Sequence, residues 1–299
     1  MEKILVVEEK YIGSRLDVFL SRSLPDISRS KIHAIIKDGR AKVNGKVAKP
    51  AFFLKAFDKI QLSLPEIPKQ SLQPYPFEVN IIYEDDDVIV VNKPSGITVH
   101  PPHAGCANTL VNALIYMKKE LAPVSPLRPG VVHRLDNETS GVMVLAKNSR
   151  SYLNLVEQFR QRAVRKEYRA IVWGVMAKEH QVVDMPLARD SRNRLQMKVS
   201  FLNSKNACTE INVADRLSDA TVLSLKIHTG RMHQIRVHLK FLGYPIAGDR
   251  KYGKKDHCGQ MLLHAYKLGF NHPSGNDFRE FVAPLPERFV KFIEDRRCK

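Results

Sequence analysis

Residues 131–147 read VVHRLDNETSGVMVLAK and place a polar turn between two apolar, strand-like runs. Two valines lead into the turn, residues 142–146 lead out of it, and Ser140 and Gly141 supply residues that favour a turn. This pattern predicts that Asp136 is held at the rigid edge of a sheet, where a carboxylate can act as a nucleophile. Asp and Asn also initiate turns, so the spacing alone favours a structural role for Asp136.

Length and charge limit the class of protein. The chain has 299 residues, 43% of them hydrophobic, which suits about two domains with a core in each. Its 48 Lys and Arg outnumber 31 Asp and Glu, and the net charge of +17 predicts a polyanionic partner, either nucleic acid or an anionic membrane. The apolar runs are only strand-sized, and residues 1–10 are too acidic for a signal peptide. We therefore expect a cytoplasmic protein that binds nucleic acid and no membrane.

The cysteines and histidines give no sign of a metal site. The four cysteines are widely scattered and form no C-x-x-C pair, which argues against a disulfide framework and a zinc site. His228, His233 and His238 recur every five residues, a spacing that scatters side chains around a helix instead of along one face. We expect reduced thiols and no bound metal.

Residues 1–64 predict a small basic α/β domain. Ser14 and Ser28 are placed to cap two helices, Gly39 to end the second, and residues 43–47 to form a hairpin around an Asn-Gly turn. Seven basic residues stand against two acidic ones between positions 26 and 50. We expect a phosphate-binding stripe formed by Arg29, Lys31, Lys37, Arg40 and Lys42.

Residues 65–76 contain four prolines and predict a semi-extended linker to a larger domain over residues 77–299. This domain alternates short strands and a few helices without a regular βαβ order, which indicates an α+β fold around a mixed, largely antiparallel sheet. The predicted strands are 88–92, 141–147, 168–173, 207–213, 221–228 and 262–270. The predicted flanking helices are 108–120, 149–162, 229–242 and 286–296.

Five segments of this larger domain resemble motifs of one enzyme family. His133–Gly141 resembles the HRLDxxTSG signature of the Rlu-type pseudouridine synthases, which act on large-subunit ribosomal RNA. Further similar segments are Asn92–Gly96 with Val99–His100, Lys166–Gly174, Thr229–His238, and Gly248–Asp249 with Tyr252–Gly253. Residues 28–45 resemble the S-four type of RNA-binding domain, which commonly precedes such catalytic domains. The resemblance implies isomerisation of uridine to pseudouridine without a cofactor, on a sheet bent around an RNA-binding cleft.

The resemblance also implies roles for individual residues. Asp136 would be the nucleophile, and Arg236 its cationic partner, because paired hydrogen bonds from an Arg stabilise an ionised carboxylate. Tyr168 would stack on the target base or assist proton transfer at its carbon 5. Arg134 would fill the space that a flipped uridine leaves. His233 is expected on the exposed flank of its helix, outside the catalytic set.

Three alternatives remain open at this stage. The substrate could be transfer RNA, or the chain could be a non-catalytic RNA-binding or ribosome-assembly factor. The second alternative is less economical because Asp136, Tyr168 and Arg236 are all present. A hydrolase of glycosidic bonds would need a second carboxylate at the same pocket, and Glu138 is the obvious candidate. A monomer is the simplest expectation for an enzyme that docks onto a much larger RNA.

Overall fold

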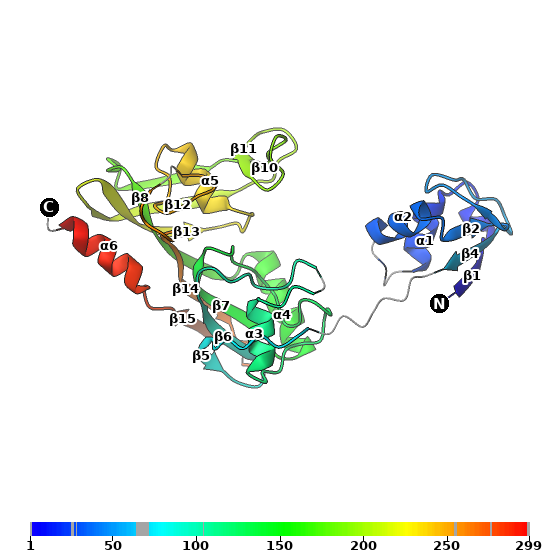
Figure 1. Cartoon of the computed structure of the whole chain (residues 1–299), viewed down its shortest axis with the longest axis horizontal. Coiled ribbons are helices and arrows are strands. Elements are labelled where there is room, and N and C mark those ends of the chain that lie inside the picture. The colour runs from blue at the N-terminus through cyan, green and yellow to red at the C-terminus, as the bar shows by residue number, and fades with distance from the viewer. Residues whose placement is uncertain are drawn as a thin grey trace. The chain divides into compact units, whose positions relative to one another are not determined.

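A computed structural model describes residues 2–24, 27, 29–63, 72–103, 105–253, 256–275 and 277–297, with Ser30 and Lys31 described by their backbone alone. The chain divides into two compact units, residues 1–69 and residues 70–299 (Figure 1). Among the described helices, none combines the length and the apolar character that crossing a bilayer requires. The helix cap predicted at Ser28 and most of the predicted linker lie outside the described residues.

The first unit packs two helices against a four-stranded antiparallel sheet in the order β1-β4-β2-β3. Its elements are β1 (Glu2–Val6), a 3-10 turn η1 (Glu9–Tyr11), α1 (Leu16–Ser23), α2 (Arg29–Lys37), β2 (Ala41–Val43), β3 (Lys46–Val47) and β4 (Lys59–Ser63). Apolar residues at helical spacing, such as Leu16, Phe19 and Leu20, supply the core with Ile32 and Ile36.

The predicted helix, helix and hairpin of this unit are confirmed. Asn44 and Gly45 both have positive φ, 51° and 80°, as the tight turn between β2 and β3 requires. Gly39, with φ 72°, ends the second helix. The predicted cap at Ser14 is wrong, because α1 begins one residue later and Arg15 occupies the N-cap without a side-chain hydrogen bond.

The second unit contains a nine-stranded sheet in the order β5-β6-β7-β14-β8-β13-β12-β9, with β15 also paired to β14. The sheet is mixed and largely antiparallel as predicted, and β7 with β14 is its parallel pair. Its strands are β5 (Asn80–Glu84), β6 (Val88–Lys93), β7 (Ser140–Ala146), β8 (Arg165–Trp173), β9 (His180–Asp184), β12 (Cys208–Arg216), β13 (Ala220–Ile227), β14 (Leu263–Asn271) and β15 (Phe278–Val282). A separate hairpin is formed by β10 (Leu187–Arg189) and β11 (Met197–Val199).

Four helices accompany the large sheet: α3 (Leu110–Tyr116), α4 (Ser149–Gln161), α5 (Gln234–Phe241) and α6 (Glu287–Arg297). In Figure 1, α3 and α4 accompany the half of the sheet made by β5 to β7, whereas α5 accompanies the half made by β8, β13 and β12. Each half has its own apolar cluster, and the side chain of Tyr168 packs against both. The site residues thus lie where the two halves meet.

The two halves join at the point where β7 runs beside β14. Gly141 has φ 120°, and a Cβ built there would lie 2.1 Å from the backbone oxygen of Ala265. Beside it, Arg288 of α6 donates to Ser140 Oγ at 2.6 Å, and Ser140 Oγ lies 2.9 Å from Nδ1 of His264. A glycine at 141 is therefore a steric requirement of the junction.

Three segments differ from the sequence-based expectation. The residues before the turn at 136 do not form a strand. Two contacts hold them beside β7: an isolated β-bridge between Val131 and Leu145, and a hydrogen bond from the backbone N–H of Val144 to His133 Nε2. The helix predicted at 229–242 begins at Gln234, because the hydroxyl of Thr229 bonds the Gln234 side chain instead of capping a helix. Residues 72–76, expected in the linker, pack on the second unit, where the N–H of Tyr75 donates to the carbonyl of Asn112.

Replacing Gly141 with Ala should destabilise the protein by more than about 3 kcal/mol, because the new Cβ would overlap the backbone of β14. Gly243→Ala is the matched control, since Gly243 also has positive φ (86°) but has open space at its Cβ position. The control should cost only the backbone strain of about 1–2 kcal/mol. Chemical denaturation of both variants checks this, and equal losses would contradict the steric account of the junction.

Candidate active site

A cavity of about 180 Å³ opens at the junction of the two sheet halves, and its wall brings together residues far apart in the sequence. Asp136 and Arg134 come from the turn before β7, Tyr168 from β8 and Arg236 from α5. All four residues predicted to act at the site therefore line one cavity. Their convergence follows from the pairing of β8 with β14 and of β14 with β7.

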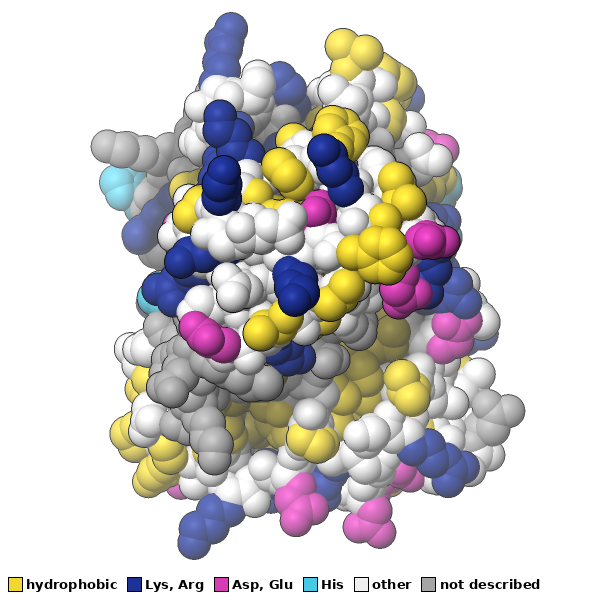
Figure 2. Space-filling model, turned by 90° about the vertical axis from the view of Figure 1, so that its right-hand side faces the viewer, with side chains coloured by type: hydrophobic (Ala, Val, Ile, Leu, Met, Phe, Trp, Pro, Cys, Tyr) yellow, Lys and Arg dark blue, Asp and Glu magenta, His cyan; other side chains and the backbone are white. Residues whose placement is uncertain are grey.

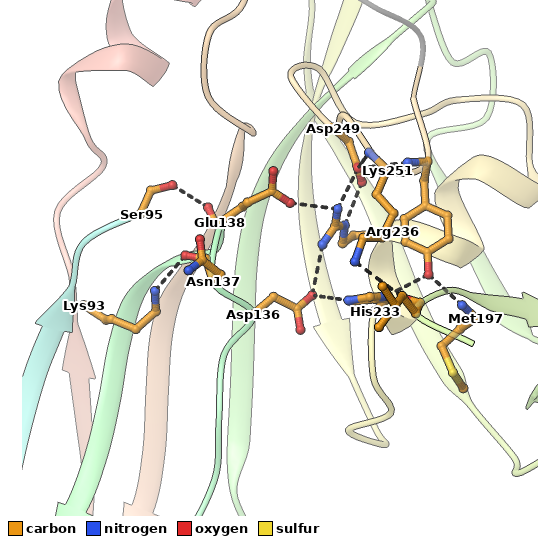
Figure 3. A network of polar contacts seen from close by, with 12 residues as sticks. Lys93, Ser95, Asp136, Asn137, Glu138, Met197, His233, Arg236, Asp249 and Lys251 are labelled. Atoms are coloured by element: carbon orange, nitrogen blue, oxygen red, sulfur yellow. Dashed lines mark hydrogen bonds and ion pairs between the residues drawn. The ribbon is translucent and has the colours of Figure 1, made fainter. Parts of the chain in front are cut away.

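Arg236 is the centre of the polar network in Figure 3. Its side chain is 2% exposed and donates to both carboxylate oxygens of Asp249, each at 2.7 Å. Its Nη2 also lies 3.0 Å from Glu138 Oε2, and its Nη1 lies 3.4 Å from Asp136 Oδ2. One buried guanidinium therefore contacts three carboxylates. One of them is Glu138, the second carboxylate that a hydrolase would need, and it is paired with Arg236.

Asp249 is the fixed partner of this arginine. Its carboxylate is fully buried and also accepts from the backbone N–H groups of Lys251 and Tyr252 at 2.9 and 3.0 Å. Burial alone would raise the pKa of Asp249, but the hydrogen bonds and charge of Arg236 and the two backbone donors outweigh it and hold that pKa below its usual value. Asp249 therefore keeps its charge under physiological conditions and orients Arg236.

Asp136 is held less tightly than Asp249. Its side chain is 20% exposed, and its Oδ2 lies 3.4 Å from Arg236 Nη1 and 3.8 Å from His233 Nε2. The backbone carbonyl of Asp136 accepts from the N–H of Thr139 at 3.2 Å, which closes the turn that carries it. The carboxylate thus faces the cavity with a cation beside it and room for a substrate.

A buried lysine fixes the loop behind Asp136. Lys93, at the end of β6, is 0% exposed, and its Nζ donates to the carbonyls of Pro94, Ile97 and Asn137 at 2.8, 2.8 and 3.1 Å. Burial lowers the pKa of Lys93 to about 7, while the charge of Asp136 acts in the opposite direction. Lys93 therefore ties residues 94–97 to the turn that carries Asp136. The family-like segment Asn92–Gly96 contains Lys93, but the contact itself could not be predicted because tertiary packing sets the positions of these carbonyls.

Tyr168 contributes an aromatic wall to the cavity. Burial and, to a smaller extent, the negative charge of Asp136 raise the pKa of the Tyr168 hydroxyl far above neutrality. The phenol therefore stays protonated, and the ring packs between the two apolar clusters. A protonated phenol can donate a hydrogen bond or a proton, and its ring can stack on a base.

Two basic residues around the cavity differ in their surroundings. Arg134 is exposed, and among the described residues its side chain has no hydrogen-bond or ion-pair partner. His233, expected on an exposed helix flank, is instead 9% exposed in its side chain and occupies the N-cap of α5 with φ 55°. Its Nδ1 lies 2.7 Å from the hydroxyl of Tyr252. The sequence could not show this contact, because it depends on how the 248–253 turn folds back on α5.

The basic residues predicted to bind phosphates lie on the first unit. Lys37, Arg40 and Lys42 are exposed, whereas Arg29 approaches the buried carboxylate of Asp17 at 3.5 Å. The side chain of Lys31 is outside the described part of the chain. Figure 2 shows Lys and Arg side chains distributed among hydrophobic ones over the visible face of the molecule.

Metal-binding groups were also sought. Within the described ranges, no three or more His, Cys, Asp or Glu side chains lie close enough together to hold a metal ion.

The chain combines a small basic unit with a domain that carries this site. That combination defines a class of protein, the enzymes that modify RNA. The chain belongs to the RNA pseudouridylate synthase family, whose model matches residues 87–241, and residues 14–60 match the S4 domain. These matches confirm the expected family and the expected RNA-binding domain. The protein is thus an isomerase that acts on RNA, and the mixed sheet is the fold of its family.

Similarity to individual relatives extends over the full chain. The uncharacterized RNA pseudouridine synthase YlyB of Bacillus subtilis is 39% identical, covering 98% of this chain and 97% of that protein. The ribosomal large subunit pseudouridine synthase D of Neisseria meningitidis serogroup A is 38% identical over 99% of this chain and 82% of its own length. The human RNA pseudouridylate synthase domain containing 1 matches in structure with a TM-score of 0.60 at 27% identity, over 69% of this chain and 83% of that one.

Asp249→Asn should lower stability at pH 7 by about 3–5 kcal/mol, because it leaves the buried Arg236 without its paired charge. The folded-state pKa of Asp249 is depressed, so its contribution is present above the unfolded-state pKa of about 3.9 and is lost as pH falls through the folded value. The difference between wild type and variant should therefore shrink below about pH 4.

Urea denaturation of both proteins from pH 3 to pH 7 measures this difference. Glu138→Gln is the control, because Glu138 is 34% exposed and makes a single contact to Arg236, and it should cost much less. A difference independent of pH would show that Asp249 acts by packing and not by charge.

Proposed function

We propose that this enzyme isomerises specific uridines in large-subunit ribosomal RNA and that Asp136 is its nucleophile. One observation carries the proposal: the Asp136 carboxylate is partly exposed, lines the cavity and lies beside a buried arginine. The full-length relative whose name specifies the ribosomal large subunit supports the choice of RNA. Transfer RNA is the other substrate that the experiment below can detect.

The reaction rearranges bonds without a net change in composition. An ionised carboxylate can attack the anomeric carbon of the ribose or carbon 6 of the base, and the N1–C1′ bond breaks. The base then turns, carbon 5 bonds to C1′, and the bond between the substrate and the Asp136 carboxylate breaks, which restores the free carboxylate. The proton on carbon 5 is lost, and N1 takes up a proton. No electrons are gained or lost, so the chemistry needs no redox cofactor. Arg236 opposes the negative charge of Asp136 during these steps.

Tyr168 and Arg134 would handle the base itself. The Tyr168 ring lines the cavity, where it would stack on the flipped uracil. Its raised pKa keeps the phenol protonated, which disfavours action as a base. Arg134 is exposed at the cavity, and its side chain has no partner among the described residues. A side chain that enters the space left by a flipped base must be free in this way. Extrusion of a paired base costs about a few kcal/mol, which such an insertion offsets.

The first unit would supply affinity and register. Lys37, Arg40 and Lys42 are exposed and suited to phosphate contacts, which position a protein on RNA without reading its sequence. Arg29, which approaches Asp17, would contribute less, and Lys31 completes the proposed set. We place the end of the RNA-binding domain at about residue 64, as the sequence indicates, and the start of the synthase domain at about residue 72, where the chain packs on the second unit. A monomer acting in the cytoplasm, where ribosomal RNA is made, fits this division.

Asp136→Asn should lower the rate of pseudouridine formation by at least about 10³-fold, because the amide is a poor nucleophile. RNA affinity should change less than about twofold, since the substitution keeps the shape of the side chain. Mass-spectrometric mapping of large-subunit ribosomal RNA and transfer RNA after incubation with each protein measures the product, and filter binding measures affinity. Glu138→Gln, a neighbouring carboxylate change, should keep most activity.

Replacing Lys37, Arg40 and Lys42 with Gln should weaken RNA binding and make its salt dependence less steep. Loss of three phosphate contacts predicts that the slope of log K against log salt falls by about 2. A charge-matched control on the second unit replaces Lys118, Lys178 and Lys291. An unchanged slope in the first variant would show that its three residues do not contact phosphates.

A further inference from the structure

Two hydrogen bonds and one longer polar contact lead from strand β11 to the carboxylate of Asp136. The backbone N–H of Met197 donates to the hydroxyl oxygen of Tyr252 at 2.7 Å, and the same hydroxyl lies 2.7 Å from His233 Nδ1. On its other side, His233 Nε2 lies 3.8 Å from Asp136 Oδ2 (Figure 3). Neither His233 nor Tyr252 takes part in the chemistry proposed for Asp136, Arg236 and Tyr168.

The contacts of the Tyr252 hydroxyl favour one tautomer of the histidine. The Tyr252 oxygen accepts from Met197, so its one proton is free to be donated to His233 Nδ1. A neutral imidazole that accepts at Nδ1 carries its proton at Nε2. That proton faces Asp136, so the imidazole presents a donor and not a lone pair to the carboxylate.

The carboxylate needs a second anchor because Arg236 is largely committed elsewhere. Arg236 gives two hydrogen bonds of 2.7 Å to Asp249 and one of 3.0 Å to Glu138, whereas its contact to Asp136 is 3.4 Å long. A carboxylate held by one long contact can swing about its side-chain bonds. The 3.8 Å gap to His233 closes to a hydrogen bond with a movement of roughly 1 Å, of the kind that substrate binding produces.

We propose that His233 is a positioning residue that orients Asp136 through an Nε2–H donor, and that Tyr252 and the backbone of β11 hold the imidazole in that tautomer. This inference rests on the proposed role of Asp136. The same contacts tie the orientation of Asp136 to the β10–β11 hairpin, whose loops expose Leu195, Phe201 and Leu202. RNA bound to this hairpin would therefore influence Asp136 through three successive contacts: Met197 to Tyr252, Tyr252 to His233, and His233 to Asp136.

Burial keeps the imidazole of His233 neutral. Burial is the largest effect and lowers the pKa of His233, the negative charges of Asp136 and Asp249 oppose it, and the positive charges of Arg236 and Lys251 reinforce it. The net direction is downward, so the ring is uncharged at neutral pH. A neutral donor orients Asp136 without taking over the role of Arg236 as its counter-charge.

Nitrogen NMR of the full-length protein with labelled histidine tests the tautomer directly, because the ring nitrogen shifts differ between the two neutral forms and the imidazolium. His233→Gln assigns the signal. We expect wild type to show the Nε2–H form at pH 7 and Tyr252→Phe to show a mixture of tautomers. An Nδ1–H form or an imidazolium in wild type would overturn the proposal, whatever Asp136 does.

Kinetics test the consequence, with an RNA that the wild-type enzyme modifies. Tyr252→Phe and His233→Leu should lower kcat by about tenfold to a hundredfold and leave KM within about twofold, as loss of orientation predicts. His233→Gln keeps an N–H donor in a side chain of similar size and should recover much of the loss. Equal rates for His233→Gln and His233→Leu would overturn the positioning role, while activity of Asp136→Asn would instead refute the proposed nucleophile.

Discussion

The bidentate ion pair between Arg236 and Asp249 is the interaction on which the site depends. A buried guanidinium is costly unless its donors are satisfied, and Asp249 satisfies two of them with help from backbone N–H groups of its own turn. The remaining donors are thereby aimed at Glu138 and Asp136 on the opposite side of the cavity. One ion pair thus links α5 and the 249 turn to the loop that carries Asp136.

The fold supplies the second constraint by bringing the two sheet halves together at Gly141. This close approach of β7 to β14 sets Asp136 at the edge of one half, opposite α5 of the other. Ser140, His264 and Arg288 add a hydrogen-bonded contact that brings α6 to the same junction. The rigid junction and the partly exposed carboxylate are complementary, because the proposed nucleophile must be oriented while a base enters beside it.

Much of this could be predicted from the sequence, because it depends on local patterns. Alternating apolar runs indicated most strands of the large sheet, and the signature motifs indicated that Asp136, Tyr168 and Arg236 meet. The start of α5 could not be predicted, because the Thr229 hydroxyl donates to the side chain of Gln234 and does not cap a helix. His233 and Lys93 could not be placed either, because their partners, Tyr252 and the carbonyls of the neighbouring loops, are set by tertiary packing.

The most direct test of the central claim is a pseudouridine map of ribosomal and transfer RNA from cells of the source organism that lack this protein. The strain would be complemented with wild type or with Asp136→Asn. The account predicts that particular positions in large-subunit ribosomal RNA lose pseudouridine and regain it with the wild-type protein alone. Restoration by Asp136→Asn, or an unchanged map in the deletion strain, would contradict it.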